Sequence, residues 1–128
     1  MIEVKLSPLS DGEFNRGVFA KCDIKKGVLF HEAPVIAYPN EEHQYIEKTL
    51  MADYAFEYGL DKTAILLGYG MLFNHSYEPN ATYEINFKNH TFDFFAYTDI
   101  KAGDEILINY NGEVDDQELL WFDQEKQE

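Results

Sequence analysis

Residues 68–80, Gly-Tyr-Gly-Met-Leu-Phe-Asn-His-Ser-Tyr-Glu-Pro-Asn, are unlike ordinary core sequence, because an apolar run ends abruptly at Asn74 and His75. These two side chains bring hydrogen-bond donors and acceptors to a point where the chain leaves the core, which suits a polar ligand. Taken alone, they also fit a turn whose side chains bond to nearby backbone. A metal site is not indicated, because the four histidines of the chain lack the spacing of metal ligands.

Around this segment, apolar residues recur in the short runs that are typical of strands. They predict strands over residues 2–6, 17–20, 28–30, 35–38, 54–58, 63–67 and 105–110, and a hairpin of 81–87 with 91–97. A short helix is expected over 40–50, since Asn40 is a good helix cap and two glutamates follow it. Residues 119–122 are expected to form a short terminal helix or turn. Many short strands with one helix indicate a mostly-β domain.

The pattern Asp-Ile-Lys-x-Gly occurs twice, at residues 23–27 and 99–103, each time just before a predicted strand. Glycine permits the positive φ of a tight turn, so the two copies predict the same turn used twice. Chance similarity of two turns is the alternative.

Composition limits the function classes. The 128 residues suffice for one domain, and a hydrophobic content of 45% with 16% aromatics excludes a disordered chain. Against 24 Asp and Glu there are 10 Lys and Arg, a net charge of -14, which argues against direct nucleic-acid binding. The acidic surface either attracts a cationic partner or only keeps the protein soluble.

Features of export and membrane insertion are missing from the sequence. The single cysteine, Cys22, cannot form an intramolecular disulfide, and there is no apolar stretch of membrane-spanning length. The first three residues lack a basic signal-peptide start. We expect a soluble, intracellular protein, cytoplasmic by default, with no membrane contact.

Three segments together resemble the SET domain. Residues 15–20, Asn-Arg-Gly-Val-Phe-Ala, with the Asp-Ile-Lys-Lys-Gly that follows, are similar to its opening motif, and residues 73–80 to its N-H-S-x-x-P-N signature. Residues 98–110, ending in Asp-Glu-Ile-Leu-Ile-Asn-Tyr, are similar to its closing motif. The resemblance covers about residues 3–112 and implies a β-clip fold with a threaded, pseudoknot-like C-terminal segment. It places a SET domain at 1–112 and a segment closing the site at 113–128.

The resemblance implies methyl transfer from S-adenosylmethionine to the ε-amine of a lysine in a basic, histone-like protein. Tyr110 matches the tyrosine beside the transferred methyl group. The positions that match cofactor contacts are Arg16, Gly17, Val18, Phe19, Asn74 and His75. The positions that match the walls of the lysine channel are Tyr54, Phe56, Tyr110, Trp121 and Phe122. For Tyr54, Phe56, Trp121 and Phe122, core packing is the alternative.

The chemistry of methyl transfer agrees with these residue types. In-line displacement depends on alignment and desolvation, and burial in an aromatic channel lowers the pKa of the substrate lysine. Tyr110 would orient the amine and is a poor general base, because the pKa of a free tyrosine is about 10.

Three positions depart from the family pattern: Asn15 replaces a frequent glycine, Asn109 a frequent aspartate, and Ile108 an aromatic residue that tunes the number of methyl groups added. The degree of methylation is therefore open. Two alternatives to an enzyme are a non-catalytic SET-fold module, which binds basic peptides or cofactor without turnover, and a structural acidic β-domain. A domain this small can also form a homodimer to cover apolar surface.

Overall fold

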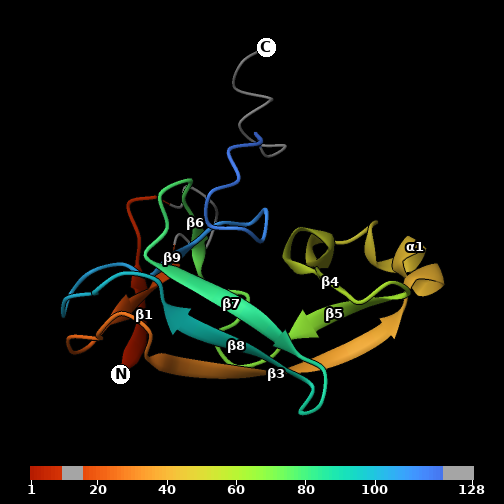
Figure 1. The fold of residues 1–128 in the computed structure, drawn as a ribbon. Helices are drawn as coiled ribbons and strands as arrows, with labels where there is room; N and C mark the ends of the chain where they lie inside the picture. Colours follow the sequence, from red (N-terminus) through yellow and green to blue (C-terminus); the bar gives the residue numbers. More distant parts are fainter. Residues whose placement is uncertain (10–15, 120–128) are drawn as a thin grey trace.

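Short strands dominate the computed structural model, which describes residues 1–9 and 16–119 (Figure 1). In chain order the elements are β1 (Ile2–Leu6), β2 (Arg16–Ala20), β3 (Leu29–Pro39), η1 (Asn40–Glu42), α1 (His43–Ile46), η2 (Leu50–Tyr54), β4 (Phe56–Tyr58), β5 (Lys62–Leu66), β6 (Asn74–His75), β7 (Ala81–Asn86), β8 (Thr91–Ala96) and β9 (Leu107–Ile108). They form a β1-β2 pair, a five-stranded sheet of order β4-β5-β3-β8-β7, and a β6-β9 pair. The expectation of a mostly-β domain is confirmed.

Strand β3 is one strand where two were predicted. The sequence predicted separate strands over residues 28–30 and 35–38, on either side of Pro34, yet β3 runs from Leu29 to Pro39 without a break. Residues 29–34 pair with β8, and residues 35–39 pair with β5 on the other side. Pro34 therefore lies where the partner changes, and its carbonyl accepts the Leu67 N–H at 2.8 Å. A proline is tolerated at such a position because it ends one ladder and does not interrupt it.

The single helix predicted over residues 40–50 is wrong in its extent. Two 3₁₀ turns flank one turn of α-helix, and the chain makes η1, α1 and η2 in succession. Asn40 does not cap them, because its Oδ1 accepts the Thr63 hydroxyl at 2.7 Å and so ties this segment to β5. Thr49 caps η2 by accepting the Met51 N–H at 3.2 Å.

Two predicted strands are shorter than expected. The strand predicted from residue 54 begins at Phe56, because Tyr54 still belongs to η2. The strand predicted over 105–110 is reduced to β9, and Glu105 only forms an isolated bridge with Phe19. Leu119 has no regular structure, and the rest of the terminal helix or turn predicted at 119–122 lies outside the described residues.

The two Asp-Ile-Lys-x-Gly segments adopt the same turn, with φ of 89° at Gly27 and 92° at Gly103. They also bind each other, because Ile24 and Ile100 exchange backbone hydrogen bonds of 2.7 and 2.8 Å. Each aspartate accepts an N–H from the other turn: Lys26 to Asp99 at 2.8 Å, and Ala102 to Asp23 at 2.9 Å. The repeat is therefore a pair of matched turns whose hydrogen bonds join residues 23–27 to residues 99–103.

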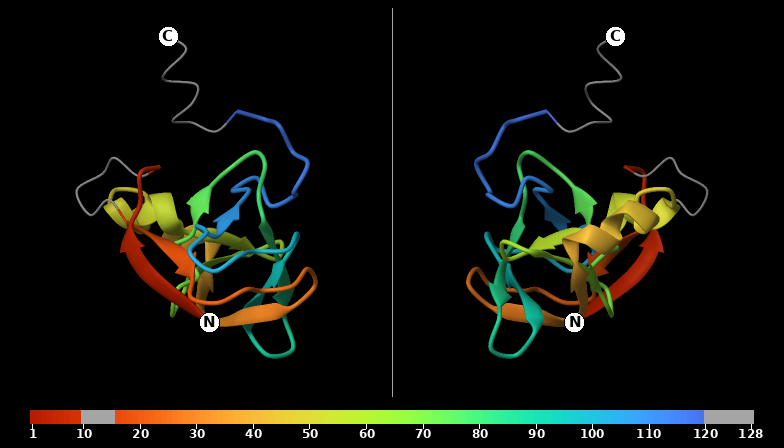
Figure 2. Two further views of the ribbon diagram at one scale, coloured as in Figure 1. Left: turned by 90° about the vertical axis from the view of Figure 1, so that its left-hand side faces the viewer. Right: turned by 90° about the vertical axis from the view of Figure 1, so that its right-hand side faces the viewer.

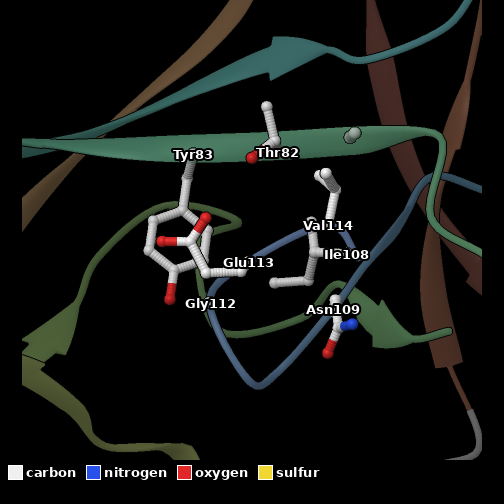
Figure 3. A pocket seen from close by; sticks show the side chains of 8 residues that line it. Thr82, Tyr83, Ile108, Asn109, Gly112, Glu113 and Val114 are labelled. Atoms are coloured by element: carbon white, nitrogen blue, oxygen red, sulfur yellow. The ribbon is translucent and has the colours of Figure 1, made fainter. Parts of the chain in front are cut away.

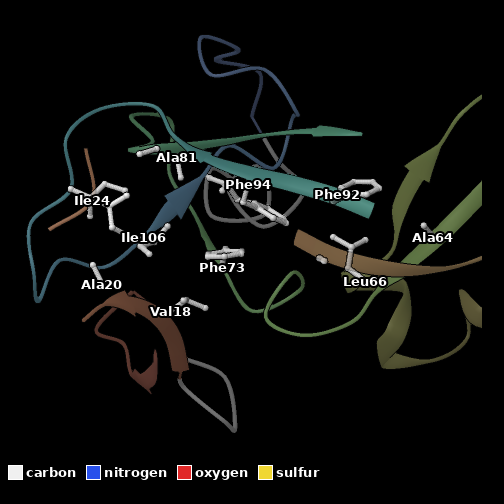
Figure 4. Close-up of a cluster of buried hydrophobic side chains, with 14 of the residues drawn as sticks. Val18, Ala20, Ile24, Ala64, Leu66, Phe73, Ala81, Phe92, Phe94 and Ile106 are labelled. Atoms are coloured by element: carbon white, nitrogen blue, oxygen red, sulfur yellow. The ribbon is translucent and has the colours of Figure 1, made fainter. Parts of the chain in front are cut away.

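The buried core runs from β2 to β5, with three phenylalanines at its centre (Figure 4). Phe73, Phe92 and Phe94 are each at most 1% exposed, and the ring centroids of Phe73 and Phe94 lie 4.7 Å apart. Burying such a side chain contributes roughly 1.5–3 kcal/mol. Because Phe73 immediately precedes β6, this packing anchors the segment that carries Asn74 and His75.

The β6-β9 pair lies between the β1-β2 pair and the strands β7 and β8 in both side views (Figure 2). The residue before β9 connects it to β2, since the Ile106 N–H donates to the Val18 carbonyl at 2.8 Å. Within residues 1–9 and 16–119, no helix is both long and apolar enough to cross a membrane.

Candidate functional site

Strands β6 and β9 run parallel and join two of the motifs found in the sequence. Asn74 pairs with Leu107 and His75 with Ile108, and the Ser76 N–H donates to the Ile108 carbonyl at 2.9 Å. This pairing places the Asn-His segment beside the closing motif. The threading of the chain implied by the resemblance stays a prediction.

The side-chain amide of Asn74 links three segments of the chain. Its Nδ2 donates to Glu105 Oε2 at 2.7 Å, to the Arg16 carbonyl at 3.1 Å and to Ser7 Oγ at 3.2 Å. Among the residues that the structure describes, none donates a hydrogen bond to Asn74 Oδ1. The amide nitrogen is thus directed into the protein, and the amide oxygen is left as an acceptor.

Gly17 makes this approach of side chains feasible. A Cβ at this position would lie 2.7 Å from Asn74 Nδ2 and closer still to the Glu105 carboxylate. The carboxylate in turn accepts the hydroxyl of the buried Ser7 at 2.7 and 2.9 Å. Any larger residue at 17 would have to displace a hydrogen-bonded group.

Tyr110 follows β9 closely, and hydrogen bonds fix both its backbone and its side chain. Its N–H donates to His75 Nδ1 at 3.0 Å, and its hydroxyl donates to the Phe73 carbonyl at 2.7 Å. Although 39% of the residue is exposed, the hydroxyl points inward. Burial raises the pKa of Tyr110 well above its usual range, and the nearby Tyr54 and Glu105 raise it further. The phenol is therefore neutral throughout the physiological range of pH.

The four opening-motif residues predicted to contact cofactor do not all face this place. Arg16 and Gly17 border the Asn74 amide through their backbone. Val18 is fully buried and its carbonyl is bonded to Ile106, while the Phe19 ring packs under the Lys5 ammonium at 4.9 Å. The geometry brings Arg16 and Gly17 to the site. The resemblance implies backbone contacts of Val18 and Phe19 with the cofactor, and these stay a prediction because they do not depend on the direction of the side chains.

Of the aromatic residues predicted to line the lysine channel, one lies near Tyr110 and another packs in the core. Tyr54, at the end of η2, lies close enough to Tyr110 to affect its pKa. Phe56 instead packs against Tyr83 and Phe92, with ring centroids 5.8 and 5.3 Å away, as the core-packing alternative expects. Trp121 and Phe122 lie outside the described residues.

Asn80, the last residue of the Asn-His-Ser-x-x-Pro-Asn signature, holds the closing motif in place. Its Nδ2 donates to the Glu105 carbonyl at 2.9 Å, and its Oδ1 accepts the Leu107 N–H at 2.8 Å. The side chain thus bridges the residues on either side of Ile106 and fixes the backbone on which Glu105 stands.

A crevice too narrow to admit a water molecule lies between β7 and residues 108–114 (Figure 3). The Tyr83 side chain points across it toward Gly112, where an added Cβ would lie 3.4 Å from the Tyr83 hydroxyl. Burial raises the pKa of Tyr83 to about 12, helped by the charges of Glu113 and Glu57. Carboxylates on β4 and on the C-terminal segment therefore both act electrostatically on this phenol.

Comparison with known proteins decides the family. The sequence model of the SET domain matches residues 15–111, about three quarters of the chain. The chain belongs to the SET domain family. The resemblance seen in the three motifs is thereby confirmed.

Relatives of this SET protein include the fission yeast (Schizosaccharomyces pombe) histone-lysine N-methyltransferase specific for H3 lysine-37. The two are 29% identical over 111 residues, which cover 86% of this chain and 71% of the relative. A crystal structure of a Plasmodium falciparum protein assigned as a histone methyltransferase is similar with a TM-score of 0.71 and 33% identity, over 94% of this chain and 96% of that one. An autoinhibited Polycomb Repressive Complex 2 bound to S-adenosylmethionine shares the fold, with a TM-score of 0.72 at 22% identity over 85% of this chain and 15% of that one.

The residues of the site fit such a cofactor. S-adenosylmethionine carries a sulfonium and an ammonium, and the site presents acceptors, namely the Arg16 carbonyl, Asn74 Oδ1 and the Glu105 carboxylate. Glu105 and Ser7 were not predicted as site residues. Glu105 lies in the closing motif, so the motif itself was the signal, whereas Ser7 stands in a Ser-Pro loop that carries no functional signal. No group of three metal-ligating side chains occurs in the described part of the chain.

Proposed function

We propose that this protein transfers a methyl group from S-adenosylmethionine to the ε-amine of a lysine in a basic, histone-like protein. The observation that supports it most is the convergence of Tyr110, Asn74 and the Arg16 carbonyl on the β6-β9 pair. Three segments that are far apart in the sequence meet there, each held by hydrogen bonds.

In this proposal Tyr110 positions the substrate amine. Its hydroxyl donates its proton to the Phe73 carbonyl, so the oxygen lone pairs remain to accept a hydrogen bond from the amine. Because its pKa is raised, the phenol does not act as a base, and the lysine loses its proton to solvent as it enters an apolar channel. When bound, the cofactor supplies the methyl group on its sulfonium.

In this proposal the rate of methyl transfer depends mainly on how well the amine and the methyl group are aligned. The new N–C bond forms as the C–S bond breaks, which requires the amine and the methyl group in line. His75 fixes the backbone of Tyr110, and Asn80 fixes the strand that precedes it. Small displacements of Tyr110 are therefore expected to slow the reaction strongly, on the order of 100-fold for 1 Å.

Charge supports a basic substrate. The net charge of -14 favours encounter with a lysine-rich segment. The same charge disfavours direct binding of nucleic acid. The fission yeast relative is named for a histone H3 lysine, so an H3 tail is the first substrate to test.

Methyl incorporation into histone H3 and into an H3 tail peptide, followed by mass spectrometry, tests the proposal. We expect wild type to methylate a lysine and Tyr110→Phe to be slower by about 100-fold while still binding S-adenosylmethionine in calorimetry. Tyr45→Phe changes a tyrosine that is 67% exposed and serves as the control. Equal rates for wild type and Tyr110→Phe would remove Tyr110 from the mechanism. Cofactor binding without turnover on any lysine-rich protein would favour the non-catalytic SET-fold module.

A further inference from the structure

We propose that Glu105 is a positioning residue that orients Asn74 and gives the site its preference for the charged cofactor over the neutral product. This inference rests on the proposed function. Methyl transfer converts the sulfonium of S-adenosylmethionine into the uncharged thioether of S-adenosylhomocysteine, so the two compounds differ by one positive charge near the reacting atoms.

Orientation of the Asn74 amide follows from what surrounds its two ends. An amide can be turned by 180° with little change in shape, and its neighbours decide which end is which. Glu105 Oε2, at 2.7 Å, and the Arg16 carbonyl, at 3.1 Å, only accept hydrogen bonds. They therefore require the nitrogen end, and Asn74 Oδ1 is presented outward as an acceptor for the ammonium of the cofactor.

The carboxylate that imposes this orientation is itself held from three sides. Ser7 donates to both of its oxygens, and Ser7 Oγ in turn accepts the Leu9 N–H at 3.1 Å. Asn80 holds the Glu105 carbonyl, and the backbone of Glu105 bridges to Phe19. A group held in this way keeps its position without ligand, which is the condition for preorganised electrostatics.

The negative charge of Glu105 is met by neutral donors. Among the described residues, Ser7 and Asn74 donate hydrogen bonds to the Glu105 carboxylate, and the Lys5–Glu3 ion pair does not involve it. The charge reaches the reacting region, because it contributes to the raised pKa of Tyr110. A sulfonium bound beside Asn74 and Tyr110 would be attracted by the Glu105 carboxylate, whereas a neutral thioether at the same place would not.

Calorimetric dissociation constants for S-adenosylmethionine and S-adenosylhomocysteine test the inference in wild type, Glu105→Gln and Glu84→Gln. Glu84→Gln removes an exposed carboxylate from β7 and so matches the change in net charge. We expect Glu105→Gln to weaken S-adenosylmethionine about ten-fold more than S-adenosylhomocysteine, and Glu84→Gln to leave their ratio unchanged.

An unchanged ratio in Glu105→Gln would overturn the role of Glu105 while leaving the proposed function intact. Wild type that binds neither compound would instead overturn the proposed function, and the charge preference with it. If Glu105→Gln does not fold, Glu105→Asp keeps the charge and shortens the side chain. We then expect both affinities to fall with the preference retained, and a lost preference with the charge still present would overturn the inference.

Discussion

Replacing Gly17 with alanine perturbs the site through a single methyl group. The new Cβ would lie 2.7 Å from Asn74 Nδ2 and would overlap the Glu105 carboxylate, and both groups are held by hydrogen bonds. Overpacking of this kind costs about 1–3 kcal/mol, which corresponds to a fall in melting temperature of roughly 3–12 °C for a domain of this size. Relief of the overlap requires Glu105 and Asn74 to separate, which breaks the 2.7 Å hydrogen bond between them.

Thermal unfolding by circular dichroism and calorimetry with S-adenosylmethionine measure the two effects. We expect Gly17→Ala to melt earlier and to bind the cofactor at least ten-fold more weakly, since loss of a hydrogen bond to a charged group costs about 1.5–3 kcal/mol. Gly27→Ala is the matched control, because its φ of 89° strains an alanine although no atom lies within 4 Å of the added Cβ. It should lose about 1 kcal/mol of stability and keep wild-type affinity. Wild-type affinity in Gly17→Ala would refute the packing described for Asn74 and Glu105.

Three further outcomes are expected. Phe94→Ala should lower the free energy of unfolding in urea by about 3–5 kcal/mol, because the residue is fully buried, and a loss below about 1 kcal/mol would contradict its place in the core. Asp23→Ala and Asp99→Ala should cost similar amounts, about 1 kcal/mol each in the same assay, because each accepts one N–H from the opposite turn, and a large inequality would show that the turns are not equivalent. The pKa of Tyr83 is about 12 in the folded state against about 10 when unfolded, so its contribution to stability is complete below about pH 10 and is lost as the pH rises toward 12. Urea unfolding between pH 8 and 11 should therefore show a smaller decline in Tyr83→Phe, and an identical decline would exclude this linkage.

Local signals in the sequence explain which parts of the fold could be predicted. The turns at Gly27 and Gly103 follow from glycine and aspartate at fixed offsets, and the structure has both. That the two turns bind each other could not be derived from spacing, because the partners are more than 70 residues apart. Pro34 could not be interpreted from the local sequence, which predicted that it separates two strands. In the structure it lies inside β3, at the point where the pairing changes from β8 to β5.

The residues of the candidate site likewise include some that local motifs predicted and others that only the fold brings to the site. Asn74, His75 and Tyr110 stood out through motifs, whereas Ser7 became a site residue through its contacts with Asn74 and Glu105, 67 and 98 residues away. Tyr54 and Phe56 belong to one alternating run in the sequence. The end of η2 between them sends the first toward Tyr110 and the second toward the core.

The long-range hydrogen bonds of the site have a consequence for folding. The hydrogen bonds that build the site span 31, 37, 58 and 98 residues, for Asn74–Glu105, Tyr110–Phe73, Asn74–Arg16 and Ser7–Glu105. Contacts of such separation form slowly, because the chain loses loop entropy before they stabilise it. During synthesis no partial chain that ends before Glu105 can make the Ser7–Glu105 or Asn74–Glu105 hydrogen bonds, so activity should appear late and together with the cooperative fold. A ligand that bridges Asn74 and Tyr110 would for the same reason stabilise the whole domain against unfolding.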